Sequence, residues 1–590
     1  KLRSQNSVDY AIGNLYYWQA PFTNAVTGFE RVPVGEDDRQ ESYALVSTNT
    51  ATYTAARGEH NFDVLVGVET NRFRNNALSL QTTGFVSSEY ELRRIVALGD
   101  QLLKKSGFAG EENRLGYIGR LNYNYADRYL FTATVRRDGV STFAPGHRWG
   151  TFPAFSAGWR ISEEPFFHVP WVNELKLRGS WGQLGNSTIP GGQYPQYVSV
   201  LLWAEYQIGN QVQLAPTPQG RLANPKLTWE TNDTRDIGFE SSLFDNHVDL
   251  SATWYQRDTR NFLVNVPVPV ESGFSSAPIN VGSMRNSGLE LEAGYRTRIR
   301  NALDLRLSGN LTTVKNRLVS LLEGVEQFQQ AGFYRTAVGF PVGYFYGYKT
   351  CGVYQTDAAA AAVPDRTVGS NQPRAGDLCF QDIDGRDEAG NLTGQPDGQI
   401  TTDDRTFLGK TIPDAYYGIN LGANWRRFDL TAFFNGVIGV QRFNSVRRDL
   451  ESMTGGGVNQ LASTLNRWSP ANPNGTMPRA ILGDPAQNAR LSDRWVEDAD
   501  FFRLKTLQVG YTLPDNLLGS RTRGTRVYVS ATNLFTLTGY SGLDPEFGAA
   551  GSNTAYGNFY AVNGSQLQAG TDFGNIPQPR MFQVGVSTTF

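Results

Sequence analysis

Apolar and polar residues alternate along much of the chain, and the alternating runs come in pairs around short polar turns. The clearest pair covers residues 115–125 and 128–139, where Tyr117 and Leu121 share one face and only Ala126-Asp127 separates the runs. A period of two residues places successive side chains on opposite faces of a β-strand. Two such runs around a two-residue turn predict an antiparallel β-hairpin.

The same layout recurs in later pairs of runs. These are 234–244 with 247–257, 288–299 with 302–314, 417–425 with 428–437, and 503–513 with 525–535. In the second of these pairs Leu289 and Leu291 face one way, whereas Glu290 and Glu292 face the other. A charged face inside a strand is costly in a sandwich core but ordinary where a sheet lines a water-filled barrel.

About 15–17 runs are near the ten residues that a tilted strand needs to cross a bilayer. Their connections alternate between very short turns, such as Asp245-Asn246 and Arg426-Arg427, and very long segments. The long segments lie near 75–113, 186–226, 260–286, 316–414, 441–498 and 538–578. Short periplasmic turns and long extracellular loops are typical of outer-membrane barrels, so the whole of 1–590 is predicted to be an all-β, transmembrane antiparallel β-barrel. A large soluble sandwich or propeller is the alternative, but it has no reason for such one-sided connections.

Composition agrees with a barrel and excludes some function classes. Aromatic residues make up 12% of the chain, charged residues 19%, and the mean hydropathy is −0.39. The sequence contains no apolar run of the length that a transmembrane helix needs, and a membrane barrel needs none. The net charge of −2 gives no support to nucleic-acid binding.

The chain ends in a final alternating strand. Phe582, Val584, Val586, Thr588 and Phe590 lie on one face of this run. A last strand that stops at a terminal Phe resembles the signal by which outer-membrane barrels are recognised for assembly, and Phe590 is the candidate. The alternative is an ordinary strand with a chance Phe.

Seven segments, in order, resemble one family, the SusC/RagA-type TonB-dependent transporters. They are 136–167 (RRDGVSTFAPGHRWGTFPAFSAGWRISEEPFF), 175–186 (LKLRGSWGQLGN), 280–292 (NVGSMRNSGLELE), 339–356 (GFPVGYFYGYKTCGVYQT), 376–385 with 397–409, 501–514 (FFRLKTLQVGYTLP) and 531–546 (ATNLFTLTGYSGLDPE). The resemblance implies a 22-stranded outer-membrane importer whose plug domain and TonB-contacting segment precede the barrel. Neither is visible in this sequence, and a signal peptide is also missing, so the chain is expected to be the carboxy-terminal barrel portion of a longer protein.

The resemblance also implies partners and a function. The expected function is active import of oligomeric nutrients, glycans or peptides, with a SusD-like lipoprotein as a lid and energy from the TonB complex through the plug region. Loops 316–414 and 441–498 are the expected docking surface for the lid, and the barrel wall is expected to contact outer-membrane lipid. Three rivals stay open: a siderophore- or cobalamin-type receptor, a passive porin, and a structural or secretion-associated scaffold.

An acidic cluster is the best candidate for a metal site. Asp382, Asp384, Asp397 and Asp404 fit positions one, three, five and twelve of a calcium-binding loop if residues 385–396 loop out between them. Oxygen ligands at every second residue let one turn wrap a hard cation. The alternative is a solvated acidic turn, and no other cofactor is expected.

Cys351 and Cys379 are the only cysteines and flank the start of the same long loop. The outer surface of a cell is oxidising, so we expect a disulfide, whose closure would contribute about 3–4 kcal/mol. Two unpaired thiols are the alternative.

Catalysis finds no support, because the four histidines belong to no metal or catalytic motif, and an enzyme is not expected. Some loop aromatics are candidates to contact a ligand, since exposed rings stack on sugars or grip peptides. They are Trp203, Tyr206, Tyr540, Tyr556 and Tyr560, and loop-on-loop packing explains them equally well.

Overall fold

The computed structural model describes Lys1 to Thr589 with some gaps. The residues outside the description are 24–29, 86, 88, 90–91, 93–95, 97–98, 190–193, 196, 198–199, 209–210, 219–221, 273, 275, 301, 322–326, 331–333, 455–458, 515–522, 547–569 and 590. Phe590, the predicted assembly signal, and Tyr556 and Tyr560 therefore lie outside the described residues.

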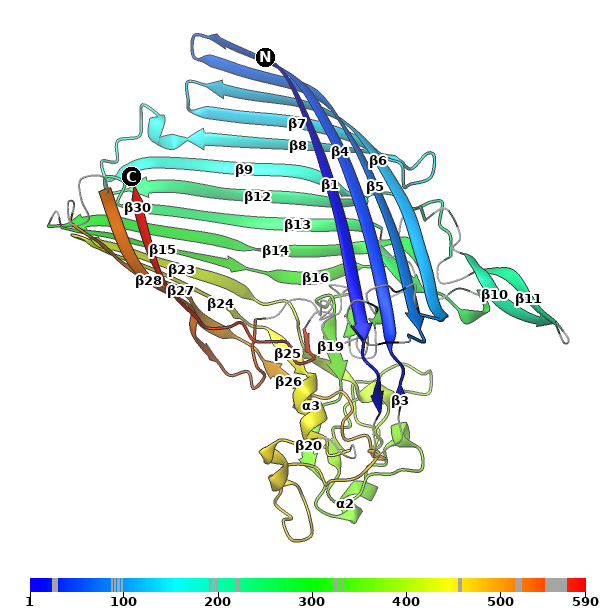
Figure 1. Ribbon diagram of the computed structural model, residues 1–590. Coiled ribbons are helices and arrows are strands. Elements are labelled where there is room, and N and C mark those ends of the chain that lie inside the picture. Colours follow the sequence, from blue (N-terminus) through cyan, green and yellow to red (C-terminus); the bar gives the residue numbers. More distant parts are fainter. Residues whose placement is uncertain are drawn as a thin grey trace. The chain divides into compact units, whose positions relative to one another are not determined.

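The fold is almost entirely β-structure (Figure 1). Seventeen strands belong to one large sheet, and each of its described pairs is antiparallel. This confirms the predicted all-β class and the upper end of the predicted strand number. None of the helices in the described ranges is both long and apolar enough to cross a bilayer.

The chain divides into two compact units. The first contains Lys1–Glu164, Arg178–Arg235 and Thr259–Gly282, and the second contains Pro165–Leu177, Asp236–Asp258 and Ser283–Phe590. Four strands of the large sheet have residues in both units. They are β9 (Val172–Asn186), β12 (Glu230–Leu243), β13 (Val248–Pro267) and β14 (Ser276–Ile299).

The first unit is a meander of long neighbouring strands. These are β1 (Leu2–Gln19), β4 (Val34–Arg57), β5 (His60–Thr83), β6 (Gln101–Tyr125), β7 (Tyr129–Val140) and β8 (Trp149–Arg160). Each pairs with the next, and Tyr125 faces Tyr129 at the predicted turn. Ala126 and Asp127 have φ of 52° and 54°, the left-handed conformation that a tight hairpin requires. Two short ribbons add β2 (Phe22–Thr23) with β3 (Glu30–Arg31), and β10 (Val200–Ile208) with β11 (Gln211–Pro218).

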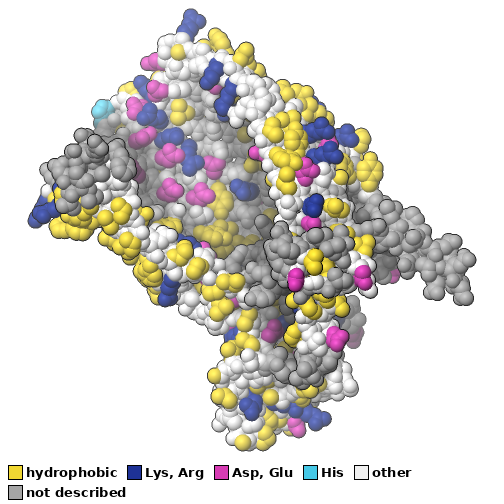
Figure 2. Space-filling view, viewed as in Figure 1, with side chains coloured by type: hydrophobic (Ala, Val, Ile, Leu, Met, Phe, Trp, Pro, Cys, Tyr) yellow, Lys and Arg dark blue, Asp and Glu magenta, His cyan; other side chains and the backbone are white. Residues whose placement is uncertain are grey.

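One face of the first unit's sheet is apolar and open. Along β5, Val64, Val66 and Val68 are 39%, 56% and 37% exposed, while Asp63 and Glu69 point to the opposite face. Exposed hydrophobic side chains are visible as yellow patches on the surface in Figure 2. A broad exposed apolar face is unstable against water and is expected where a strand wall faces lipid.

The second unit continues the pattern. Its strands are β15 (Leu303–Thr313), β16 (Lys315–Ser320), β23 (Ala415–Trp425), β24 (Phe428–Ile438), β27 (Phe501–Thr512), β28 (Arg523–Thr538) and β30 (Met581–Thr589). Leu289, Leu291 and Tyr295 of β14 are exposed on one face, as their alternation predicts. Phe582, Val584 and Val586 of β30 are at least 66% exposed and likewise share a face.

Three long connections in the second unit contain short elements of their own. They hold the strands β17 (Gln327–Gln330), β18 (Tyr334–Ala337), β19 (Tyr344–Gly347), β20 (Thr350–Val353), β21 (Leu378–Phe380), β22 (Thr406–Gly409), β25 (Gln441–Asn444), β26 (Val496–Asp498) and β29 (Thr571–Asp572). They also hold helices α2 (Asp357–Ala361) and α3 (Ser445–Glu451). The 3₁₀ turns there are Arg366–Val368, Thr402–Asp404, Ala462–Asn466 and Asp493–Trp495, and two more, Ile161–Glu163 and Val270–Ser272, lie elsewhere in the chain.

Three predicted loops differ from the structure. The segment 75–113 is mostly strand, because β5 continues to Thr83 and β6 begins at Gln101. The segment 260–286 shrinks likewise, since β13 runs to Pro267 and β14 begins at Ser276. The segment 186–226 contains the β10–β11 ribbon. The alternation predicts strands of about ten residues, the length that crosses a bilayer, whereas the backbone pairing continues into polar residues beyond the apolar band.

Candidate functional site

The described residues of 314–414, 439–500 and 539–580 fold together into what we term the loop assembly. One buried core contains Tyr334, Phe345, Phe443, Leu491 and Trp495. A second contains Tyr348, Leu378, Phe380 and Ile400. The first core joins residues of two long loops and the second joins separate parts of one loop, so the long loops have packed interiors of their own.

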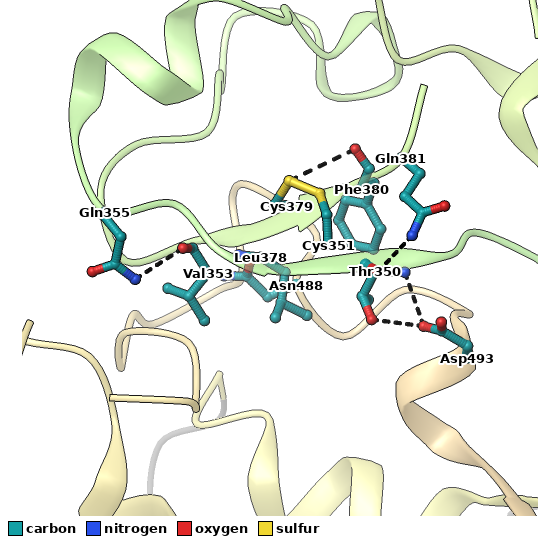
Figure 3. Close-up of a disulfide and its surroundings, with 10 residues drawn as sticks. All are labelled: Thr350, Cys351, Val353, Gln355, Leu378, Cys379, Phe380, Gln381, Asn488 and Asp493. Atoms are coloured by element: carbon teal, nitrogen blue, oxygen red, sulfur yellow. Dashed lines mark hydrogen bonds between the residues drawn. A yellow bond between two sulfur atoms is a disulfide. The ribbon is translucent and has the colours of Figure 1, made fainter. Parts of the chain in front are cut away.

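A disulfide joins Cys351 of β20 to Cys379 of β21, with Cα atoms 5.1 Å apart (Figure 3). The two strands pair antiparallel around the bond. Asp493 anchors the ribbon to the second loop, because its carboxylate accepts hydrogen bonds from the Thr350 amide at 2.9 Å and the Thr350 hydroxyl at 2.7 Å. The disulfide therefore closes a ribbon of the first loop, and the second loop is hydrogen-bonded to that ribbon.

A buried arginine, Arg490, links Asp365 to the aromatic residues of the second core. The guanidinium of Arg490 pairs with Asp365, whose side chain is 1% exposed, and its Cζ lies 3.7 Å from the ring centroid of Phe380. Tyr348 lies on it as well, at 4.4 Å. A guanidinium held by a carboxylate and by aromatic faces is a strong structural link in a dry environment.

The four predicted calcium ligands do not gather into one cage. Residues 385–396 do loop out, so that Asp382 lies next to Asp397; the Asp382 carboxylate accepts from the amides of Asp397 at 3.1 Å and Gly398 at 2.6 Å. Asp384 accepts from the amides of Thr393 at 3.0 Å and Gly394 at 2.7 Å.

Asp404 is fully buried and points inward. It accepts from the amides of Ile383 at 2.7 Å, Asp384 at 3.1 Å and Thr401 at 2.7 Å, and it completes a capping box with Thr401. Among the described residues, no group of three or more acidic, His or Cys side chains is placed to hold a metal. At least one oxygen of each of the four carboxylates accepts a backbone amide, so the described residues hold no preformed cage, and the calcium interpretation stays a prediction.

A partly buried network joins helix α3 to the third loop. Glu497 of β26 accepts from the Ser541 amide at 2.9 Å and from the Arg447 guanidinium at 3.0 Å. Burial alone raises the pKa of Glu497, but the Ser541 and Arg447 bonds outweigh it and hold the pKa below its usual value. The carboxylate is therefore charged, and both of its oxygens accept hydrogen bonds inside the loop assembly.

Of the five candidate ligand-contacting aromatics, Tyr540 is the one whose side chain the structure describes. Tyr540 is 6% exposed, and its hydroxyl donates to Asp572 at 2.8 Å, so it packs inside the loop assembly and is not available to a ligand. Burial and the nearby Asp572 charge raise its pKa. Trp203 and Tyr206 lie on β10, and their side chains are outside the description.

The face of the second unit's sheet opposite the exposed apolar residues carries a polar hollow of about 490 Å³. Its lining includes Glu240, Asp249, Glu292, Asn310 and Asn420. Asp249 accepts from the Ser242 hydroxyl at 2.7 Å. Such a wall can hydrogen-bond hydroxyl- or amide-rich molecules but offers little to an apolar ligand.

Sequence reasoning missed the arginines that organise the loop assembly. Arg490, Arg447 and Arg503 are each held by carboxylates at least four residues away, and most of these partners lie on other segments. A single arginine has no periodicity, and its neighbours in the sequence do not show which distant carboxylate it meets, so no local signal identifies it. The cysteine pair and the acidic spacing were the available signals that separate points of these loops meet.

Comparison with known proteins identifies a family. The family model described as "TonB dependent receptor-like, beta-barrel" matches residues 2–534. Among curated proteins, TonB-dependent receptor P3 of Formosa agariphila is 32% identical over 92% of this chain and 52% of its own length. The TonB-dependent receptor SusC of Bacteroides thetaiotaomicron is 27% identical over 98% of this chain and 52% of its own length.

Solved structures support the fold. The structure titled "Structure of the RagAB peptide transporter" matches with a TM-score of 0.80 at 23% identity, covering all of this chain and 60% of that one. The chain spans about half the length of the curated relatives it matches. The shared part is the strand wall with its long loops.

Proposed function

The chain belongs to the family of TonB-dependent receptor-like β-barrels and is an outer-membrane protein of the SusC/RagA type, and from this premise we propose that it is the barrel part of an active importer of oligomeric nutrients. The cargo class is a glycan or a peptide. One relative is titled a peptide transporter, and the polar hollow of the second unit suits either kind of oligomer.

A SusD-like lipoprotein is the proposed partner, and the observation that carries this is the loop assembly. A lid needs a surface of fixed shape, and the disulfide, the Arg490 cluster and the Glu497 network hold these loops in one arrangement. Leu465 and Leu482 in the second loop are 77% and 75% exposed, outside the predicted lipid face. Exposed leucines on a rigid loop suit a protein partner.

Energy would come from the inner-membrane TonB complex through the plug region of the whole protein. In cells, import should stop when TonB is deleted while the barrel stays in the membrane. Continued import without TonB would favour the passive porin.

Co-purification tests the lid. The tagged full-length protein, extracted from its native membrane, should bring down a lipoprotein that mass spectrometry identifies as SusD-like. The double variant Leu465→Glu/Leu482→Glu should lose it. The double variant Leu465→Met/Leu482→Met keeps apolar side chains of similar volume at the same two positions, so it is the matched control and should retain the lipoprotein. Recovery of other surface or periplasmic proteins alone would favour the scaffold, and recovery of none with growth on iron chelates would favour the siderophore-type receptor.

A further inference from the structure

Three exposed arginines lie on the apolar face of the first unit. Arg72 and Arg74 are on β5 and Arg137 is on β7. They share a face with Val64, Val66 and Val68, because even-numbered residues of β5 pair across odd-numbered residues of β6 and β7. We call these residues the outer arginine cluster.

The face below the cluster is uncharged. Starting at the hairpin end, the row Phe62–Tyr123–Phe131 and the row Val66–Gly119–Val135 carry only apolar and small residues. From the aromatic pair Tyr125–Tyr129 to Tyr117, eight residues span about 26 Å at 3.3 Å per residue. Because strands of outer-membrane barrels are tilted by about 35–45°, this length rises about 20 Å along the membrane normal and covers most of the apolar band, which is about 25 Å tall.

The cluster begins where this band ends. Arg137 pairs across from Tyr117, and Arg72 and Arg74 lie four and six residues further along β5 than the Val68 partner of Tyr117. In this orientation the hairpin turns mark the periplasmic end and the long connections the extracellular end. The arginines therefore lie at the level of the outer leaflet's headgroups.

The positions of two aromatic rings also place Arg137 at the level of the lipid headgroups. The Arg137 Cζ lies 5.4 Å from the ring centroid of Trp149, and Tyr117 stacks beside that ring at 6.1 Å. Both rings are about half exposed. Tyr and Trp are enriched at membrane–water interfaces because one part of the ring is apolar and the other is wet.

The local charge is positive. Glu111 pairs with Arg72 at 3.1 Å, and the side chain of Arg72 is still 56% exposed. Three guanidinium groups against this carboxylate leave two positive charges in excess. Glu41 is the next carboxylate on this face, and it accepts the Tyr10 hydroxyl at 2.6 Å.

We propose that the outer arginine cluster binds the phosphate groups of an outer-leaflet lipid, whose acyl chains lie on the uncharged band beneath. A guanidinium fork matches a phosphate bidentately, and this pairing is stronger at the edge of a low-dielectric layer than in water. Within the first unit the site is on the face of the sheet opposite to Asp63 and Glu69, so it is independent of a cargo that contacts the polar face. It rests on the outer-membrane orientation and not on the import function.

Native mass spectrometry of the detergent-extracted full-length protein tests this. The probe is bis-phosphorylated lipid A, with enzymatically dephosphorylated lipid A and inorganic phosphate as comparison ligands. The triple variant R72Q/R74Q/R137Q should bind bis-phosphorylated lipid A about tenfold or more weakly, as the loss of one or more charge-assisted contacts predicts. Arg114→Gln is the matched control, because Arg114 is on β6 and lines the opposite face with Glu69 and Asn71.

The wild-type protein should prefer the phosphorylated lipid by a similar factor, a comparison that needs no variant and holds if the triple variant fails to fold. Equal retention of the two lipids, or equal binding by a folded triple variant, would overturn the proposal. Binding of inorganic phosphate as strong as that of the lipid would also overturn it. Lid co-purification by the triple variant should be unchanged, so failure here is distinct from failure of the import proposal.

Discussion

Removing Arg503 should open the third loop of the assembly. Arg503 is on β27 and is 2% exposed, and its guanidinium donates to Asp544 at 2.5 Å, to Glu546 at 2.7 Å and to the Thr536 hydroxyl at 2.8 Å. Asp544 in turn accepts from the amides of Glu546 at 2.9 Å and Gln578 at 3.0 Å. The arginine thus holds a carboxylate that organises two points of the loop.

The variant Arg503→Met keeps most of the side-chain volume but leaves Asp544 buried at 5% exposure without its cation. Breaking a buried charge pair from one side costs about 3–5 kcal/mol. Each 1.4 kcal/mol is a factor of ten, so local opening should become roughly a hundred- to several-thousand-fold more frequent. Hydrogen exchange at the Glu546 and Gln578 amides measures this directly, since Asp544 holds both.

Two further variants make the test specific. Lys505→Met removes a neighbouring cation of Glu546 whose side chain is 29% exposed, and its effect should stay near or below 1 kcal/mol. Adding Asp544→Asn to Arg503→Met should recover part of the protection, because the orphaned charge is gone and an oxygen acceptor is kept. A hydrogen-exchange rate in Arg503→Met within about threefold of the wild-type rate would refute the reasoning, since it would mean that the Arg503 contacts contribute little to the stability of this loop.

Three other outcomes are expected. The double variant Cys351→Ala/Cys379→Ala should lower the local stability of its ribbon by about 3–4 kcal/mol, seen as faster proteolysis there than in the oxidised wild type. The pKa of Glu497 is lowered in the folded protein, so the stability that this carboxylate contributes is present above the ordinary pKa of 4.5 and is lost as the pH falls through the folded pKa. Fluorescence of the neighbouring Trp495 should report this loss of stability. The variant Glu497→Gln should remove that pH dependence. Calcium chloride should leave the thermal midpoint unchanged, because Asp404 and its neighbours bond to backbone amides, whereas a rise that Asp382→Asn abolishes would restore the calcium interpretation.

The strand wall could be predicted because its signal is local. Leu289 and Leu291 face one way and Glu290 and Glu292 the other, and the structure exposes the leucines as the alternation requires. The positions at which the strands end were predicted less well than the strands themselves. Residues 75–83 are mostly polar and were predicted to be loop, yet they pair with β6, since backbone hydrogen bonds need no apolar side chains.

The loop assembly could not be predicted in the same way. Arg503 meets carboxylates 41 and 43 residues downstream, and Arg447 meets one 50 residues away. Such pairs form only when two segments that are far apart in the sequence fold together, and no local pattern in the sequence indicates which segments will meet. The acidic cluster shows the converse, because the spacing brought Asp382 beside Asp397 correctly but could not say that amides would take the oxygens.

These buried charges have a common consequence for how the loops behave. Glu497 holds Arg447 from helix α3 on one side and Ser541 from the third loop on the other. Apolar contacts between the same segments would tolerate sliding, whereas a charged group that loses its partner in a dry site is penalised at once. A loop that opens therefore leaves a charge without its partner, and this cost suits the platform that the proposed lid needs, one that does not itself deform while the lid opens and closes.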